Sequence, residues 1–243
     1  MSLPLQDHIQ KDGFRLRGVE MSRIDGFSDV VFGFALTLLV VSLEVPRTYS
    51  ELHASLRGFL PFAICFFFLM SVWYAHYRFF RRFGTHDVMT IFLNSCLLFV
   101  ILFYVYPLKF LFTFLSNIIL GATTESFETW QQVRELMVLY GVGFATVYLL
   151  LAALYWNGFR QRHELSLTDK EVLLARSYIS DCTGYGCIGL ISAIVAILLP
   201  VTHTGMSGWI YALIYPFKLI HGRWTRSRLA KQIAVRKPAK LRH

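Results

Sequence analysis

Residues 23–45 read RIDGFSDVVFGFALTLLVVSLEV, an almost continuous apolar run in which two aspartates follow the opening arginine. A helix of about 20 mostly apolar residues is long enough to cross the hydrocarbon core of a membrane. Ser22 is a suitable N-cap and Pro46 cannot continue a helix, so we expect a helix over residues 22–45. At 1.5 Å per residue this helix is roughly 35 Å long, which is enough for one membrane span.

Five further stretches have the length and composition of membrane-spanning helices. Hydrophobic residues make up 55% of the 243 residues, charged residues make up 16%, and the mean hydropathy is +0.50. Soluble domains carry about 25% charged residues, so the composition indicates lipid as the main solvent. The sequence therefore predicts an all-α integral membrane protein with six transmembrane helices, at 24–45, 57–77, 88–107, 133–156, 177–199 and 205–221.

Apolar character continues beyond the third of these spans, from Pro107 to Leu120 around Lys109. Proline removes a backbone donor and either kinks or ends a helix. Three interpretations of this extension stay open. It is a continuation of the helix beyond a kink, an interfacial helix, or the true end of the span.

Basic residues separate between the two sides of the six-span arrangement. All 24 lysines and arginines fall on one side except Arg47, Arg57, Lys109 and Arg134. The positive-inside rule makes the basic side cytoplasmic, so we expect both termini of this multi-pass protein of the cell (plasma) membrane in the cytoplasm. The net charge of +9 is then explained by anionic lipid headgroups of the bilayer, and no nucleic-acid partner is expected. Residues 1–221 form the predicted six-helix transmembrane domain, and residues 222–243 form a basic cytoplasmic tail.

Cysteines and histidines give no indication of a metal site, a cofactor or an enzyme. The cysteines all lie inside predicted spans without metal-site spacing, so neither disulfides nor zinc are expected at Cys65, Cys96, Cys182 and Cys187. Four histidines lie in loops or at span ends, where solvated surface is expected, namely His53, His163, His203 and His221. No nucleophile–base pair is evident either. The sequence therefore predicts that the protein is not an enzyme.

The predicted first helix divides into two faces, because successive side chains rotate by about 100°. One stripe consists of Phe27, Phe34, Leu38, Val41 and Val45, with Thr37 on its flank. The opposite face carries Asp29, Gly33, Leu36 and Val40. In a regular helix the aspartate therefore cannot share a lining face with the stripe.

An aspartate in a membrane span is costly and needs partners. Two interpretations of Asp29 stay open. In one, this side chain and Asp25 favour the positive N-terminal end of the helix in the headgroup layer. In the other, it belongs to a buried network, and Gly33 lets a neighbouring helix approach closely. The candidate partners are then Trp73 and His76 on one face of the second span and Asn94 in the third.

The segment Arg23-Ile-Asp-Gly-Phe27-Ser28-Asp29, followed by Phe32-Gly-Phe-Ala-Leu-Thr37, resembles the start of the first helix in the transmembrane protein 175 family of potassium channels. The resemblance is to short prokaryotic members with one six-helix unit. Trp73-Tyr-Ala-His76 at the end of the second span and Leu93-Asn94 in the third extend it over residues 20–107.

This resemblance implies a homotetramer in which four first helices line a central pore for potassium and other monovalent cations. It implies a hydrophobic constriction at Phe34, Leu38 and Val41, and a hydroxyl layer at Thr37 that sets cation preference. The motif residues anchor the pore helix in this interpretation, as a network of Arg23, Phe27, Ser28, Asp29, Trp73, His76 and Asn94. An apolar ring gates by dewetting and supplies few oxygens to an ion, so we expect a weakly selective channel.

Two other features of the spans offer rival interpretations. Thr183-Gly184-Tyr185-Gly186 resembles a potassium-filter signature but lacks its valine and lies in a stretch long enough to cross outright, which favours close helix packing. Asp181 is a second intramembrane acid, for which a packing or capping role is favoured over a proton-sensitive one. The alternative function is a proton-coupled membrane transporter that uses Asp29, Asp181 and His76 as a relay.

Overall fold

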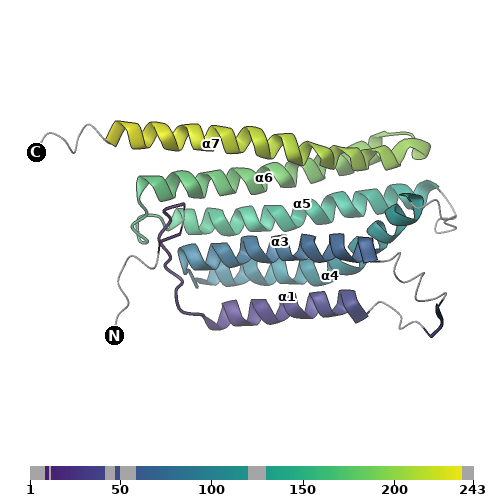
Figure 1. The fold of residues 1–243 in the computed structure, drawn as a ribbon, viewed down its shortest axis with the longest axis horizontal. Helices are drawn as coiled ribbons and strands as arrows, with labels where there is room; N and C mark the ends of the chain where they lie inside the picture. Colours follow the sequence, from purple (N-terminus) through teal and green to yellow (C-terminus); the bar gives the residue numbers. More distant parts are fainter. Residues whose placement is uncertain (1–8, 11, 42–46, 50–58, 120–129, 237–243) are drawn as a thin grey trace, which may run out of the picture.

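The computed structural model describes residues 9–10, 12–41, 47–49, 59–119 and 130–236. Within these ranges the chain forms α1 (Arg23–Val41), α3 (Phe59–Phe83), α4 (Val88–Ile119), α5 (Trp130–Arg160), α6 (Asp169–Leu198), the 3₁₀ helix η2 (Val201–Leu213) and α7 (Ile214–Arg236). Figure 1 shows the helices side by side along one direction, with α1 at one edge of the bundle and α7 at the other. Successive long helices run in opposite directions, as expected for spans joined by short connections.

The described residues confirm an all-helical membrane protein. Four helices are long and apolar enough to cross a membrane, over Phe62–Phe83, Val88–Leu111, Gln131–Arg160 and Asp169–Leu198. They correspond to the second, third, fourth and fifth predicted spans. α1 covers the described part of the first predicted span, and its expected end at Pro46 lies outside the described residues.

Two helix boundaries differ from the predicted ones. α4 passes through Pro107 without ending and continues to Ile119, so the continuation is the interpretation that fits. The sixth predicted span, 205–221, is not one α-helix, because η2 ends at Leu213 and α7 begins at Ile214. Gly205 and Gly208 lie in η2, and glycine lowers α-helix propensity. α7 then runs past residue 222, where the basic tail is expected to begin.

The first turn of α1 is capped as the sequence predicts. The backbone N–H of Asp25 donates to Ser22 Oγ at 3.2 Å, and the N–H of Ser22 donates to Asp25 Oδ2 at 3.1 Å. These reciprocal bonds satisfy two backbone donors that a helix start leaves free. Ser22 is therefore confirmed as the N-cap.

Glycines let α6 pack closely on its neighbours. A Cβ atom at Gly189 would lie 2.9 Å from the carbonyl oxygen of Gly141 in α5, so the two backbones are almost in contact. A Cβ atom at Gly186 would lie 2.8 Å from Leu149, and one at Gly184 would lie 2.2 Å from Phe217 of α7. α6 is uninterrupted here. The glycines of the Thr-Gly-Tyr-Gly segment therefore serve packing and do not form a re-entrant filter.

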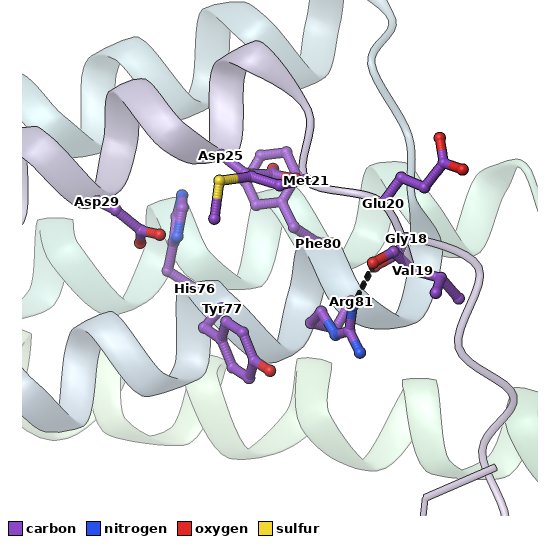
Figure 2. Close-up of a pocket in the computed structure, with 10 residues that line it drawn as sticks. All are labelled: Gly18, Val19, Glu20, Met21, Asp25, Asp29, His76, Tyr77, Phe80 and Arg81. Carbon is purple, nitrogen blue, oxygen red and sulfur yellow. Dashed lines mark hydrogen bonds between the residues drawn. The ribbon is translucent and has the colours of Figure 1, made fainter. Parts of the chain in front are cut away.

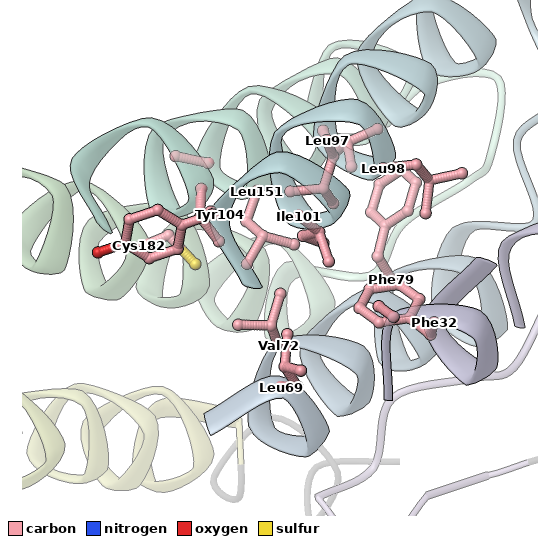
Figure 3. Close-up of a cluster of buried hydrophobic side chains, with 14 of the residues drawn as sticks. Phe32, Leu69, Val72, Phe79, Leu97, Leu98, Ile101, Tyr104, Leu151 and Cys182 are labelled. Carbon is pink, nitrogen blue, oxygen red and sulfur yellow. The ribbon is translucent and has the colours of Figure 1, made fainter. Parts of the chain in front are cut away.

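A buried apolar cluster joins five helices, from α1 to α6. Figure 3 shows part of it, including Phe32, Val72, Ile101 and Leu151, all of which are at most 3% exposed. Because side chains from each helix interlock there, the cluster fixes the position of α1 on the bundle. Removing one such side chain leaves a cavity that the neighbours fill only in part.

Residues before α1 close one end of the bundle. Phe14 is fully buried, and Arg17 forms two hydrogen bonds of 3.1 Å to the carboxylate of Glu171. Glu171 also completes a capping box with Thr168 at the start of α6. Arg82 of α3 contacts Asp12 from the same segment. Several basic side chains at this end are therefore paired within the protein.

Asp87 joins the start of α4 to the end of α5. Its carboxylate accepts bonds from Thr90 Oγ1 at 2.5 Å, Gln161 Nε2 at 3.0 Å and Asn157 Nδ2 at 3.1 and 3.2 Å. Burial raises the pKa of Asp87, but these hydrogen bonds outweigh burial and lower the pKa to about 2. The carboxylate is therefore held ionised.

Replacing Asp87 by Ala should lower the midpoint of thermal unfolding of the detergent-solubilised protein. The bond to Thr90 at the start of α4 and the bonds to Asn157 and Gln161 are lost together. The expected loss in free energy of unfolding is about 1–2 kcal/mol. The midpoint is followed by tryptophan fluorescence. Glu164→Ala, which removes an exposed acid from the next connection on the same side, is the matched control.

The effect of Asp87→Ala should also depend on pH in one direction. The folded-state pKa is below the usual value of an aspartate, so the stabilisation is complete above about pH 4 and is lost as the pH falls toward about 2. The difference in midpoint between wild type and variant should shrink over that interval. A difference that stays constant down to pH 2 would contradict this account.

Candidate functional site

The face of α1 that packs on the bundle is neither of the two predicted faces. Ser28, Phe32, Ala35 and Leu39 are at most 3% exposed and lie at i, i+4, i+7 and i+11. Both predicted faces therefore flank this one. The sequence does not distinguish it, because nearly every side chain from residue 30 to residue 41 is apolar and the pattern has little amphipathicity.

The outward side of α1 is broad and apolar. Val30 is 70% exposed, Phe34 is 55% exposed and Val40 is 49% exposed. Thr37 is exposed among them, and its hydroxyl donates to the carbonyl oxygen of Gly33 at 2.9 Å. The hydroxyl proton of Thr37 is thus donated within the helix. The oxygen remains able to accept a hydrogen bond on the outward side.

Two of the three predicted constriction residues, Phe34 and Leu38, lie on or beside this outward side. Phe34 projects from the bundle, and Leu38 is partly buried at one margin. Val41 is the last residue of α1, and its side chain lies outside the described residues. Gly33 is exposed, and a Cβ atom there would meet nothing within 4 Å. The close approach of a neighbouring helix that we expect at Gly33 is therefore absent among the described residues of the chain.

Three buried side chains connect α1, α4 and α3 in one chain of hydrogen bonds. Ser28 Oγ donates to the carbonyl oxygen of Ile24 at 2.7 Å and accepts from Asn94 Nδ2 at 2.9 Å. Asn94 Oδ1 lies 2.7 Å from His76 Nε2. All three side chains are at most 2% exposed.

The direction of these bonds shows which ring nitrogen of His76 carries a proton toward Asn94. Because the Asn94 oxygen is an acceptor, Nε2 of the imidazole carries the proton and donates. Phe32 of α1 and Phe80 of α3 pack against the same ring, at centroid distances of 5.5 and 4.7 Å. The imidazole therefore connects α1 to α3 both by packing and through the polar chain.

Asp29 has a separate partner at the edge of the bundle. Trp73 Nε1 of α3 donates to Asp29 Oδ1 at 2.8 Å. At 100° per residue this aspartate is about 140° around α1 from Phe34. The carboxylate is therefore held against α3, away from Phe34.

A cavity of about 290 Å³ with several polar groups in its wall lies beside the start of α1 (Figure 2). Carboxylates of Asp25 and Asp29, the His76 ring and Arg81 are among the groups that line it. Asp25 Oδ1 and His76 Nδ1 are buried without a protein hydrogen-bond partner among the described residues. The cavity has polar groups in its wall and is large enough for water to satisfy both atoms.

The remaining motif residues are placed differently. Phe27 is 62% exposed, and Arg23 is also exposed. Of the seven predicted network residues, the structure thus joins five by side-chain hydrogen bonds in two groups, Ser28–Asn94–His76 and Asp29–Trp73. The sequence analysis did not predict that Asp25 lines this cavity. Its position in the first turn after the predicted N-cap Ser22 is a signal that could have indicated a polar site there.

Asp181 and His221 form a second polar pair, between α6 and α7. Asp181 Oδ1 lies 2.5 Å from His221 Nδ1, and the imidazole is 10% exposed. The expectation that His221 is solvated surface is therefore wrong, because the acid on the facing helix holds it. His163 and His203 are exposed as expected, and His53 lies outside the described residues.

No metal centre is formed by the residues that the structure describes. They contain no group of three or more His, Cys, Asp or Glu side chains that could hold an ion. The four cysteines are free thiols.

Comparison with known proteins places the polar network in a family context. Residues 23–104 match the family described as endosomal/lysosomal potassium channel TMEM175. A protein of Marivirga tractuosa, described as a potassium channel, is 38% identical over 226 residues, which cover 88% of this chain and 92% of that protein. The chain belongs to the TMEM175 family. This confirms the resemblance, and also the prediction that the protein is not an enzyme.

The TMEM175 fold extends beyond the matched segment. A crystal structure of the potassium channel MtTMEM175 with a nanobody fusion protein has a TM-score of 0.80 at 37% identity, covering 90% of this chain and 99% of that one. A crystal structure of a TMEM175 homolog from Chamaesiphon minutus has a TM-score of 0.53 at 22% identity, covering 82% and 96%. The second likeness concerns the fold alone. Both α1 and its hydrogen-bond partners lie within the segment that matches the TMEM175 family.

Replacing Asn94 by Leu, which has the same branching but makes no hydrogen bond, should destabilise the TMEM175 fold. The variant removes both bonds of Asn94 and leaves the His76 Nε2–H buried without an acceptor. We expect a loss of about 1–3 kcal/mol. The loss is measured as a lower midpoint of unfolding in detergent.

Ser95→Ala is the matched control for Asn94→Leu. Its hydroxyl lies on the next residue of α4, is exposed, and bonds only the carbonyl of Ile91 in its own helix. Its midpoint should change little. Equal shifts in the two variants would mean that the buried chain of hydrogen bonds does not fix α1.

Proposed function

We propose that this TMEM175 chain forms a homotetramer in the cell membrane and conducts potassium, with weak selectivity over other monovalent cations. Four copies of α1 line the central pore. The observation that carries this proposal is the outward apolar side of α1, with Val30 and Phe34 more than half exposed on a helix that is fixed on its inner side. Description of the Marivirga tractuosa relative as a potassium channel supports potassium as the permeant ion.

The constriction consists of Phe34, Leu38 and Val41, with the hydroxyl of Thr37 between them. Four copies of each apolar side chain form rings that exclude water when they are narrow, so a small change in radius decides conduction. Such rings offer few oxygens to replace the hydration shell of an ion, and discrimination between cations is weak. The acceptor oxygen of Thr37 is the polar group at this level that favours a cation.

The buried hydrogen bonds hold the pore helix in position on the bundle. Ser28 holds α1 against α4 through Asn94, and Asp29 holds it against α3 through Trp73. In this role the acid does not bind the permeant ion. Arg23 and Phe27, which are exposed in the single chain, contact neighbouring subunits or headgroups at the mouth of the pore.

Charge supports an orientation with both termini in the cytoplasm. The start of α1 and the end of α7 lie at the same end of the bundle (Figure 1). Arg81, Arg160 and Arg228 belong to helix segments at that end, and basic residues mark the cytoplasmic side. In this arrangement residues 1–221 are the six-helix transmembrane domain, and residues 222–243 extend from it into the cytoplasm.

The transporter alternative has less support. A relay through Asp29, Asp181 and His76 requires these groups to share one path. Asp29 lies on α1 at one edge of the bundle, whereas Asp181 faces α7 at the other edge (Figure 1). Between these edges lies the mostly apolar buried cluster of Figure 3, in which no Asp, Glu, His, Lys or Arg is found among the described residues.

Purified protein should be tetrameric and should pass potassium in liposomes. Mass is measured by light scattering with a correction for detergent, and flux by a potassium-dependent fluorescence assay under an imposed gradient. Sodium should also pass, at a lower rate. A monomeric mass together with silent liposomes would contradict the proposal.

Phe34→Ala should raise potassium flux and lower selectivity over sodium. The substitution removes the bulkiest side chain from the proposed constriction, so the pore stays wet over a wider radius. The matched control is Phe103→Ala, which removes an equally exposed phenylalanine from α4, away from the outward side of α1. Unchanged flux in Phe34→Ala would exclude Phe34 from the constriction.

A further inference from the structure

A groove of about 390 Å³ follows the outer face of α6, between α5 and α7. Trp156 of α5 and Phe217 of α7 line it from either side. α6 supplies its length with Arg176, Ile179, Ser180, Thr183, Gly184 and Cys187. The groove lies at the edge of the bundle away from α1 (Figure 1), so four α1 helices around a central axis leave it on the lipid-facing side.

Polarity changes in one direction along this groove. Arg176, Ser180, Thr183 and Cys187 lie at i, i+4, i+7 and i+11 on one face of α6, and all four are exposed. The exposed residues that follow toward the other end of α6 are apolar, namely Leu190, Ile191, Ile194 and Ile197. Ser180 to Leu190 spans about 15 Å at 1.5 Å per residue, which is half of a 30 Å hydrocarbon core. The groove thus has a cationic end and two hydroxyls, and beyond Cys187 the exposed face of α6 continues as apolar surface.

Two guanidinium groups stand at the cationic end. Arg176 and Arg162 lie over the ring of Phe159, with distances of 5.3 and 4.9 Å to its centroid. Among the described residues neither arginine forms an ion pair, whereas Arg15, Arg17 and Arg82 at the same end of the bundle do. Acidic side chains of the described part of the chain therefore do not neutralise the positive charge beside the groove.

The wall formed by α7 is preformed. Gly184 has no side chain where the Phe217 ring approaches, because a Cβ atom there would lie 2.2 Å from that ring. One bond between Ser177 Oγ and Thr225 Oγ1, at 2.8 Å, holds α7 beside α6 at the cationic end. The groove therefore does not have to open before a ligand enters.

We propose that this groove binds one anionic phospholipid of the bilayer. The phosphate contacts Arg176, with Arg162 nearby, and the hydroxyls of Ser180 and Thr183 donate to the ester region. One acyl chain lies along Gly184 and Cys187 against Trp156 and Phe217. Anionic lipids are abundant on the cytoplasmic side of membranes, the side to which the basic end of the bundle is assigned. This site does not depend on ion conduction.

Native mass spectrometry of the full-length protein in detergent tests the proposal. Defined amounts of phosphatidylglycerol or phosphatidylcholine with identical acyl chains are added, and the bound fraction of each is measured. Wild type should retain phosphatidylglycerol in preference. Arg176→Gln should reduce that preference about five-fold, the factor expected for one basic side chain near an anionic lipid.

Arg223→Gln is the matched control. This arginine is exposed on α7 at the same end of the bundle but does not line the groove. The Arg223→Gln protein should prefer phosphatidylglycerol over phosphatidylcholine to the same degree as wild type. If Arg176→Gln keeps the wild-type preference, or if both variants lose it equally, the lipid is held by diffuse positive charge and the site is excluded.

Cys187→Trp tests the apolar part of the groove without changing charge. The added ring fills the space between Trp156 and Phe217, so binding of both lipids at this site should fall by a similar factor. Equal elution volumes of variant and wild type in size-exclusion chromatography show that the variant is folded. Unchanged binding of both lipids in a folded Cys187→Trp protein would overturn the assignment of the acyl chain.

Discussion

The buried hydrogen bonds from Ser28 through Asn94 to His76 are the constraint on which the placement of α1 depends. Lipid offers no replacement for a lost hydrogen bond, so polar groups inside a span must find partners within the protein. Here a serine, an amide and an imidazole on three helices satisfy one another. The outward side of α1 can then remain apolar, because its rotation is already fixed from the inside.

Some helices of the bundle are held together by close backbone packing and others by polar pairs. At α5 and α6 the backbones almost touch through Gly141 and Gly189, and no polar contact is needed there. At the edges, α1 and α7 are held by the polar pairs Asp29–Trp73 and Asp181–His221. The α5–α6 contact thus depends on shape, whereas the two outer helices also depend on specific polar partners.

Much of the fold and part of the candidate site could be predicted from the sequence. Hydropathy located the four apolar spans, since length and composition alone decide whether a helix can cross a membrane. Ser22 was predictable as an N-cap because that signal is local. Trp73 could be named as one of three candidate partners of Asp29, because an acid in lipid is costly and few polar side chains are available, but the sequence did not decide among them. The core face of α1 was not predictable, because apolar residues surround the helix on all sides.

What the sequence by itself determined is the helical membrane class, the segregation of basic residues and the short set of polar candidates in the spans. Only the tertiary structure decided which candidates meet. His221 pairs with Asp181, and Arg17 pairs with Glu171, which is 154 residues distant along the chain. Such contacts depend on the rotation and depth of packed helices, which no local periodicity encodes. The same is true of the groove beside Arg176, since its walls come from three helices.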